Sequence, residues 1–236
     1  MADTAQDIVD LVNRFNGLVD DLQSGINAAI DWIPWGLGWI ADKIHDAWNS
    51  LMDKIHEVFD PLVFILSNLG SPGTVSSTGD GWSSQVGSPV SARVSLADLG
   101  SLAVDDSWSG DSADQYRQQA PLQKTALQNI KTQFTDGISG ALKDVSAAIQ
   151  FFFGAMVVAI GLWIAAMITA VAATGTIVGI PVGVLVAVGA GVAFGAAFYA
   201  AGENLKSQCR SANTTLAQKL AENTGYPGEA WPKATL

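Results

Sequence analysis

Apolar residues recur at steps of three and four along most of the chain, which is the spacing of one face of an α-helix. The pattern predicts one amphipathic helix that starts near Ile8 and a second, with a coiled-coil-like seam, from Ile44 to Leu69. Proline disfavours helix in the residue before it. We therefore expect the first helix to end near Pro34 and the second to kink or restart near Pro61.

The middle of the chain has a different pattern. The stretch from residue 70 to 106 is rich in Ser, Gly and Thr and predicts a loop. Its last part, from Val94 to Val104, fits either a short strand or a helical turn. Ser107-Trp108-Ser109-Gly110 then predicts a sharp turn, because glycine adopts backbone conformations that other residues avoid. A helix capped by Asp111 or Ser112 is expected to follow.

A long uncharged stretch follows, from Val145 to Gly202. Two arms, 151–173 and 177–201, are each long enough to cross a bilayer as a helix, and the residues between them predict a bend. Small residues recur every fourth position in the second arm, a spacing that lets helices approach closely; they are Gly175, Gly179, Gly183, Ala187, Gly191 and Gly195. The length of the arms favours contact with a membrane, but such a hairpin also fits the buried centre of a soluble oligomer, and both interpretations stay open.

These patterns predict an all-α protein, an elongated helical bundle with a W-x-G helix-turn-helix and a long apolar, Ala/Gly-rich helical hairpin. The expected segments are acidic N-terminal amphipathic helices (1–69), a Ser/Gly-rich loop (70–106), the W-x-G turn with an amphipathic helix (107–150), the apolar hairpin (151–202), and an amphipathic helix with an extended tail (203–236).

Charge and composition narrow the function. The 236 residues carry 12 Lys and Arg against 22 Asp and Glu, a formal net charge of −10, which argues against a nucleic-acid partner. With one cysteine and two histidines, and no nucleophile–base pair or phosphate loop, we expect no catalytic residues, no metal, no cofactor and no enzyme. The first residues lack the features of a cleavable signal peptide.

Three tryptophans lie close together after the first predicted helix. Trp32, Trp35 and Trp39 flank two glycines in an acidic segment. Tryptophan is typical of membrane–water interfaces, so these residues could form an interfacial belt. They could equally fill a corner between two helices.

Two short motifs point to a family. The pattern W-x-G-x-S-A-x-x-Y runs from Trp108 through Gly110 to Tyr116. It resembles the WXG proteins exported by type VII (ESX) secretion in actinobacteria and related Gram-positive bacteria. In that family the W-x-G turn links two antiparallel helices, and a Y-x-x-x-D/E signal follows the helical pair. Tyr199 and Glu203 fit that signal, although about 90 residues separate the two motifs here.

The chain is longer than the short WXG proteins and has an apolar hairpin between the motifs. This layout is similar to the larger ESX secretion-associated proteins of the EspA/EspE type. The resemblance implies export to the cell envelope or beyond, a cognate helical secretion partner or chaperone, and self-assembly into an oligomer or filament, with membrane lipid as a further candidate partner. The alternatives are a membrane-inserting, pore-forming effector and a resident two-pass membrane protein.

Overall fold

The computed structural model describes residues 4–102, 106–222 and 225–234. It is 87% helical, and no strand occurs within these ranges. The all-α fold class is therefore confirmed.

The chain divides into two compact units. Unit 1 contains Met1–Ser71 and Ala148–Lys206, and unit 2 contains Pro72–Ala147 and Ser207–Leu236. The apolar hairpin thus folds together with the N-terminal helices, although the two lie far apart in the sequence.

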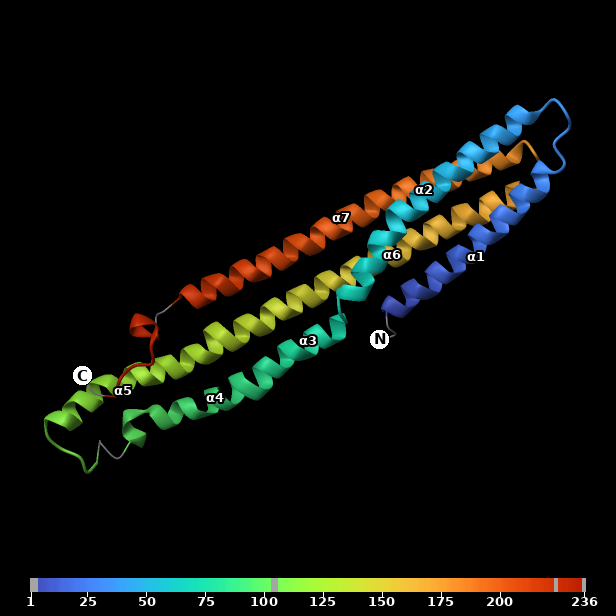
Figure 1. Cartoon of the computed structure of the whole chain (residues 1–236). Coiled ribbons are helices and arrows are strands. Elements are labelled where there is room, and N and C mark those ends of the chain that lie inside the picture. The colour runs from blue at the N-terminus through green and yellow to red at the C-terminus, as the bar shows by residue number, and fades with distance from the viewer. Residues whose placement is uncertain (1–3, 103–105, 223–224, 235–236) are drawn as a thin grey trace. The chain divides into compact units, whose positions relative to one another are not determined.

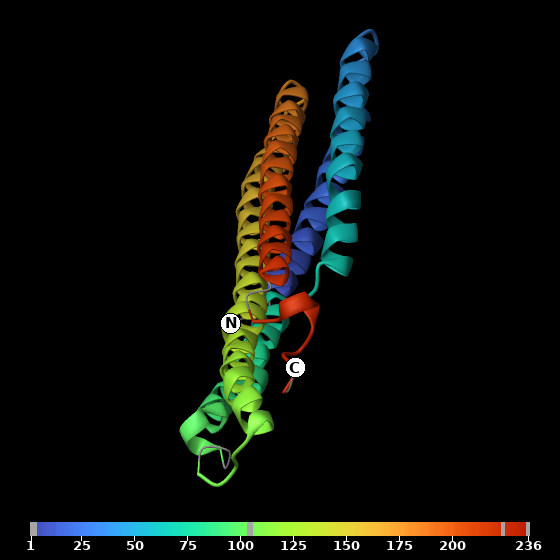
Figure 2. The ribbon, with the colours of Figure 1, turned by 90° about the vertical axis from the view of Figure 1, so that its left-hand side faces the viewer.

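Unit 1 is a bundle of four helices (Figures 1 and 2). They are α1 (Thr4–Ile30), α2 (Gly38–Asn68), the second part of α6 (Asp136–Ala173) and the first part of α7 (Gly179–Ala221). α1 ends shortly before Pro34, as predicted. A kink or a restart was predicted near Asp60; α2 does not restart there and continues as one helix through Pro61. The turn between α6 and α7 covers residues 174–178 and confirms the predicted bend.

Each helix of unit 1 supplies a ring to an aromatic cluster in the core. Phe15 of α1, Phe59 of α2, Trp163 of α6 and Phe194 of α7 pack with ring centroids 4.7–6.0 Å apart. Trp163 and Phe15 are fully buried. Phe59 and Trp163 each contact the other three rings, and Phe15 and Phe194 each contact two. This cluster therefore joins the N-terminal helices to the apolar hairpin.

Unit 2 is an antiparallel helical hairpin. Its first arm contains α3 (Pro72–Gly81), the π-helix η1 (Trp82–Gly87), α4 (Ser88–Arg93) and the 3-10 turns η2 (Val94–Ala97) and η3 (Leu99–Ser101). Its second arm contains α5 (Asp111–Asn129), the π-helix η4 (Ile130–Thr135) and the start of α6.

The prediction of a loop over residues 70–106 is wrong, because its described part is mostly helical. The small residues that predicted a loop instead allow the two arms to approach closely. A Cβ on Gly79 would lie 3.1 Å from the Ser139 carbonyl oxygen, and the Ser146 hydroxyl donates to the Pro72 carbonyl at 2.8 Å. Tertiary packing thus overrides the weak helix propensity of this segment.

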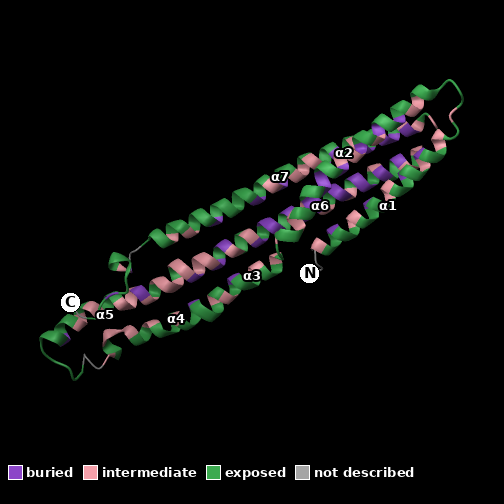
Figure 3. Ribbon diagram, in the orientation of Figure 1, coloured by how far each residue is buried: buried purple, intermediate pink, exposed green. Residues whose placement is uncertain are grey.

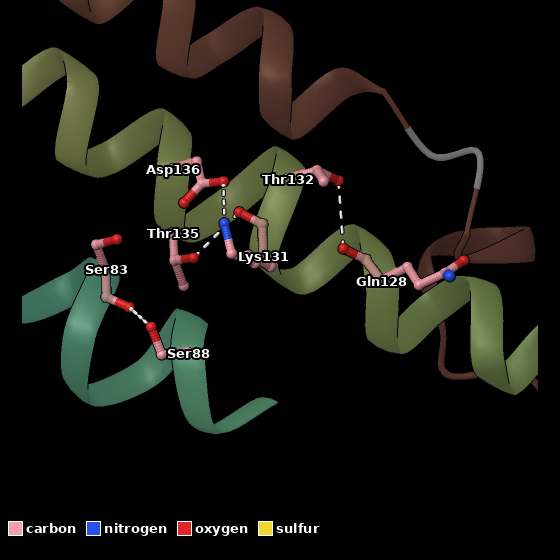
Figure 4. A network of polar contacts seen from close by, with 7 residues as sticks. All are labelled: Ser83, Ser88, Gln128, Lys131, Thr132, Thr135 and Asp136. Atoms are coloured by element: carbon pink, nitrogen blue, oxygen red, sulfur yellow. Dashed lines mark hydrogen bonds and ion pairs between the residues drawn. The ribbon is translucent and has the colours of Figure 1, made fainter. Parts of the chain in front are cut away.

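The two π-helices η1 and η4 pack against each other in unit 2. A Cβ on Gly87 would lie 2.5 Å from the Thr135 hydroxyl oxygen, so any other residue there would have to displace the Thr135 side chain. Figure 4 shows the polar contacts around it: the Ser88 hydroxyl donates to the Ser83 carbonyl five residues earlier, and Lys131 pairs with Asp136 at 2.7 Å. The Ser83 and Lys131 carbonyls also accept the backbone amides of Ser88 and Asp136, five residues later, which is the hydrogen-bond spacing of a π-helix.

The described part of the C-terminal segment, residues 225–234, packs within unit 2, where the sequence predicted an extended tail. The Tyr226 hydroxyl donates to the Ala126 carbonyl at 2.8 Å, and its ring lies 5.8 Å from that of Phe134. Burial raises the pKa of Tyr226. A Cβ on Gly225 would lie 3.2 Å from the Ala126 Cα, so glycine lets this segment lie close against α5.

Candidate functional sites: the W-x-G hairpin and the apolar helix pair

The W-x-G motif lies where the chain of unit 2 reverses. Going along the two arms, Gly79 lies opposite Ser139, Gly87 opposite Thr135, and Asp98 pairs with Lys124. The sequence separation within each pair shrinks toward residue 110, as it does in an antiparallel hairpin. The W-x-G turn therefore forms the tip that joins two antiparallel helical arms.

Glycine at position 110 is needed for this turn. Its φ is +100°, in the left-handed region that favours glycine, and its carbonyl accepts hydrogen bonds from the amides of Ala113 and Asp114. Gly110 is thus the N-cap of α5, with no side-chain hydrogen bond, and the prediction that Asp111 or Ser112 caps the helix is wrong. Asp111 instead lies in the first turn, where a carboxylate favours the helix dipole.

The other motif residues gather around the turn. The rings of Trp108 and Tyr116 lie 5.8 Å apart. Arg117 donates from Nη2 to the Trp108 carbonyl at 2.9 Å and from Nη1 to Asp114 at 2.8 Å, which ties the turn to the first part of α5. Trp108 remains 43% exposed, so an aromatic surface is available at the tip of the hairpin.

The small residues in the middle of α7 face α6. A Cβ on Gly183 would lie 2.8 Å from the Ala173 Cβ and 3.0 Å from the Ala170 Cα, and a Cβ on Gly191 would lie 2.7 Å from the Trp163 ring. Ala187 between them is fully buried. These three positions therefore pack the two arms of the hairpin together within one chain.

The remaining small residues have other surroundings. Gly175 lies in the turn between α6 and α7, and Gly179 begins α7 with its amide bonded to the Thr176 hydroxyl. A Cβ on Gly195 would make an ordinary contact with Val58 of α2. The small residues of the predicted stripe thus have three kinds of surroundings within unit 1: some lie in or next to the turn, some pack against α6, and one contacts α2.

Trp163 was not recognised from the sequence as a key residue of the hairpin. Its indole Nε1 donates to the Ala187 carbonyl at 2.8 Å, so it bonds to α7 as well as packing in the aromatic core. The sequence did offer an indication of this role, because Trp163 is the one tryptophan in the uncharged stretch 145–202. A tryptophan N–H needs a hydrogen-bond partner when it is buried.

The opposite face of the hairpin is exposed and apolar. Exposed positions recur at steps of three and four along both helices, alternating with buried ones (Figure 3). The large side chains on this face are Phe151, Val158, Leu162 and Ile168 of α6, Val178 of the turn, and Val182, Leu185, Val186 and Val192 of α7. We call these residues the hairpin outer face; they lie within the stretch that has no charged residue.

The two helical segments that contain the hairpin, Asp111–Ala173 and Gly179–Ala221, are long and apolar enough to cross a membrane. Their most apolar windows are less than half buried in the structure. Length and composition therefore allow membrane association of the hairpin.

Tyr199 and Glu203 lie one turn apart on α7 in unit 1, and both are exposed. Glu203 pairs with Lys206 at 3.1 Å. The W-x-G motif lies in unit 2, so the two motifs belong to different units.

Within the described ranges, no group of three or more His, Cys, Asp or Glu side chains could hold a metal ion. His45 and His56 are both exposed, and Cys209 is an exposed free thiol. No protein-family model, curated protein or solved structure matches the chain.

Proposed function

We propose that this chain is a non-enzymatic substrate of type VII secretion that assembles with copies of itself at the cell envelope. The observation that carries the secretion part is the geometry of the W-x-G motif. A W-x-G turn at the tip of two antiparallel helical arms is what the resemblance to the WXG proteins implies, and Trp108, Gly110 and Tyr116 have that arrangement.

The surface of the W-x-G hairpin supports a helical secretion partner. Apolar side chains remain exposed along both arms of unit 2: Trp82, Val86, Leu96, Trp108 and Leu122. Helical partners bind by laying an apolar face against such side chains. We expect the cognate partner or chaperone to cover this surface before export.

The hairpin outer face supports self-assembly. A soluble monomer rarely exposes a continuous apolar surface of this kind, and larger exposed patches are typical of protein or membrane contacts. The face carries no charge, so another copy of the same uncharged face could cover it without burying an unpaired ion.

A membrane-inserting effector is the second candidate function. It is favoured by the length and low charge of α6 and α7 and by their incomplete burial. In this case α1 and α2 would shield one face of the hairpin until lipid replaced them. A resident two-pass membrane protein is a further alternative that rests on the same two helices.

Export is the test of the secretion assignment. We expect Trp108→Ala and Gly110→Ala to lower export by at least about tenfold in an actinobacterium with an active type VII system. Gly110→Ala forces a side chain into a backbone conformation (φ +100°, ψ 175°) that is essentially restricted to glycine, at a cost of about 1–3 kcal/mol. The measurement is the ratio of secreted to cell-associated protein.

Matched controls are available in the same unit. Trp231 is exposed like Trp108 and lies outside the surface expected to bind the partner, and a Cβ on Gly100 would meet no atom within 4 Å. Trp231→Ala and Gly100→Ala should be exported as the wild type is. Normal export of both motif variants, at normal cellular levels, would overturn the assignment.

A further inference from the structure

The connection between α1 and α2, together with the first turn of α2, presents three tryptophans to solvent. Trp32 is 81%, Trp35 105% and Trp39 56% exposed. The interpretation of these residues as filling for a helix–helix corner is therefore wrong. Keeping three large indole rings in water forgoes the stabilisation that their burial would supply, so their exposure requires another explanation.

The same end of unit 1 carries the turn of the apolar hairpin (Figure 1). A Cβ on Gly25 would lie 2.7 Å from the Thr174 hydroxyl oxygen, so the last turns of α1 lie against the start of that turn. Val178 in the turn is 79% exposed. The tryptophans and an uncharged turn thus share one end of the bundle.

We propose that this end, defined by Trp32, Trp35, Trp39 and Val178 and called here the tryptophan tip, inserts into the interface of a phospholipid bilayer. Tryptophan prefers that depth because its ring is apolar while its N–H can still bond to water or lipid. The turn beside it offers Thr, Gly, Ile and Val, which enter an interface without the cost of desolvating a charge.

Charge identifies the kind of bilayer. Residues 1–70 contain 3 basic and 11 acidic side chains. Near the tip, Asp31 and Asp42 are exposed, and the ammonium group of Lys43 lies 5.1 Å from the centroid of the Trp39 ring. An acidic unit is repelled by anionic lipid, so insertion of indole rings has to supply the binding. The tip therefore fits a zwitterionic bilayer better than an anionic one.

The test is flotation of the purified full-length protein with phosphatidylcholine vesicles. Flotation separates vesicle-bound protein from aggregates, which sediment. We expect the wild type to float, and the fraction bound to fall when phosphatidylserine replaces part of the phosphatidylcholine. Binding should survive high salt, because it does not depend on attraction between opposite charges.

The decisive variant replaces all three tryptophans by serine (Trp32→Ser, Trp35→Ser, Trp39→Ser). Because interfacial binding scales with the apolar area inserted, its partition coefficient should fall by about tenfold or more. Bromine-labelled lipid should quench the wild-type tryptophan emission and quench the variant much less. Trp35→Ser alone should lower binding by a smaller factor, and since this side chain packs against nothing, the fold is preserved.

The control is Trp82→Ser with Trp231→Ser, which removes two exposed tryptophans of unit 2. It should bind vesicles as the wild type does. The proposal would be overturned if the wild type does not float, if the triple variant floats equally well, or if the control loses as much binding as the triple variant.

Discussion

Trp163→Ala is expected to lower the free energy of unfolding of unit 1 by about 3–5 kcal/mol, the usual range for removing a buried tryptophan or phenylalanine. The substitution would leave a cavity between Phe15, Phe59 and Phe194, whose rings all pack on this indole. It would also remove the hydrogen bond to the Ala187 carbonyl. Denaturant unfolding followed by circular dichroism measures the change.

Two further variants separate cavity formation from the loss of the hydrogen bond. Trp163→Phe keeps a ring in the core but removes the N–H donor, so its cost should be smaller than that of Trp163→Ala. Trp35→Ala removes a fully exposed indole and should change stability by less than about 0.5 kcal/mol. Equal stability of Trp163→Ala and Trp35→Ala would contradict the aromatic core described for unit 1.

Gly183→Leu should destabilise unit 1 by about 3 kcal/mol, at the upper end of the usual cost of overpacking. The nearest atoms to a Cβ at this position are the Ala173 Cβ and the Ala170 backbone, at 2.8 and 3.0 Å. Neither can rotate away, so α6 and α7 would have to separate. Denaturant unfolding again provides the measurement.

Gly189→Leu is the matched control, six residues further along the same helix. A Cβ there would meet no atom within 4 Å, and the position is exposed. Leucine has the higher helix propensity, so this variant should be as stable as the wild type or slightly more so. If the two variants were equally destabilised, Gly183 would not be a point of close helix contact.

Local chemistry explains which elements were predictable from the sequence. The hairpin of α6 and α7 could be predicted because an uncharged stretch of this length folds as helix, and the turn at Gly110 because glycine tolerates a positive φ. The helices that pack against this hairpin, α1 and α2, could not be predicted. An amphipathic stripe shows that a helix has a buried face, but it does not show which other helix covers that face.

The wrong loop prediction and the overlooked tryptophan both come from packing between segments that are distant in the sequence. Residues 70–106 contain many glycines and serines, which favour loops when judged locally, yet Gly79 and Gly87 are where the second arm comes closest. Trp163 was overlooked for a related reason: its importance depends on rings from α1, α2 and α7 that only the fold brings together. Long-range packing decides both cases.

The same limit applies to the candidate sites. The motif residues Trp108, Gly110 and Tyr116 are close in sequence, so their grouping at one turn could be expected. The small residues of α7 were expected to pack helices together, but membrane packing and packing between subunits both remained open. Gly183, Ala187 and Gly191 instead face α6 of the same chain, so the surface that we propose for assembly is the hairpin outer face.

The central claim is that copies of this chain cover one another's hairpin outer face. The most direct test is light scattering of the protein purified without detergent, with electron microscopy of the same sample. The account predicts a water-soluble particle that contains two or more copies of the 24.6 kDa chain. Leu162→Lys with Leu185→Lys, on the outer face, should dissociate it, whereas Phe64→Lys, at an exposed position of α2, should not. A stable monomer, or an aggregate that only detergent or lipid resolves, would contradict the claim.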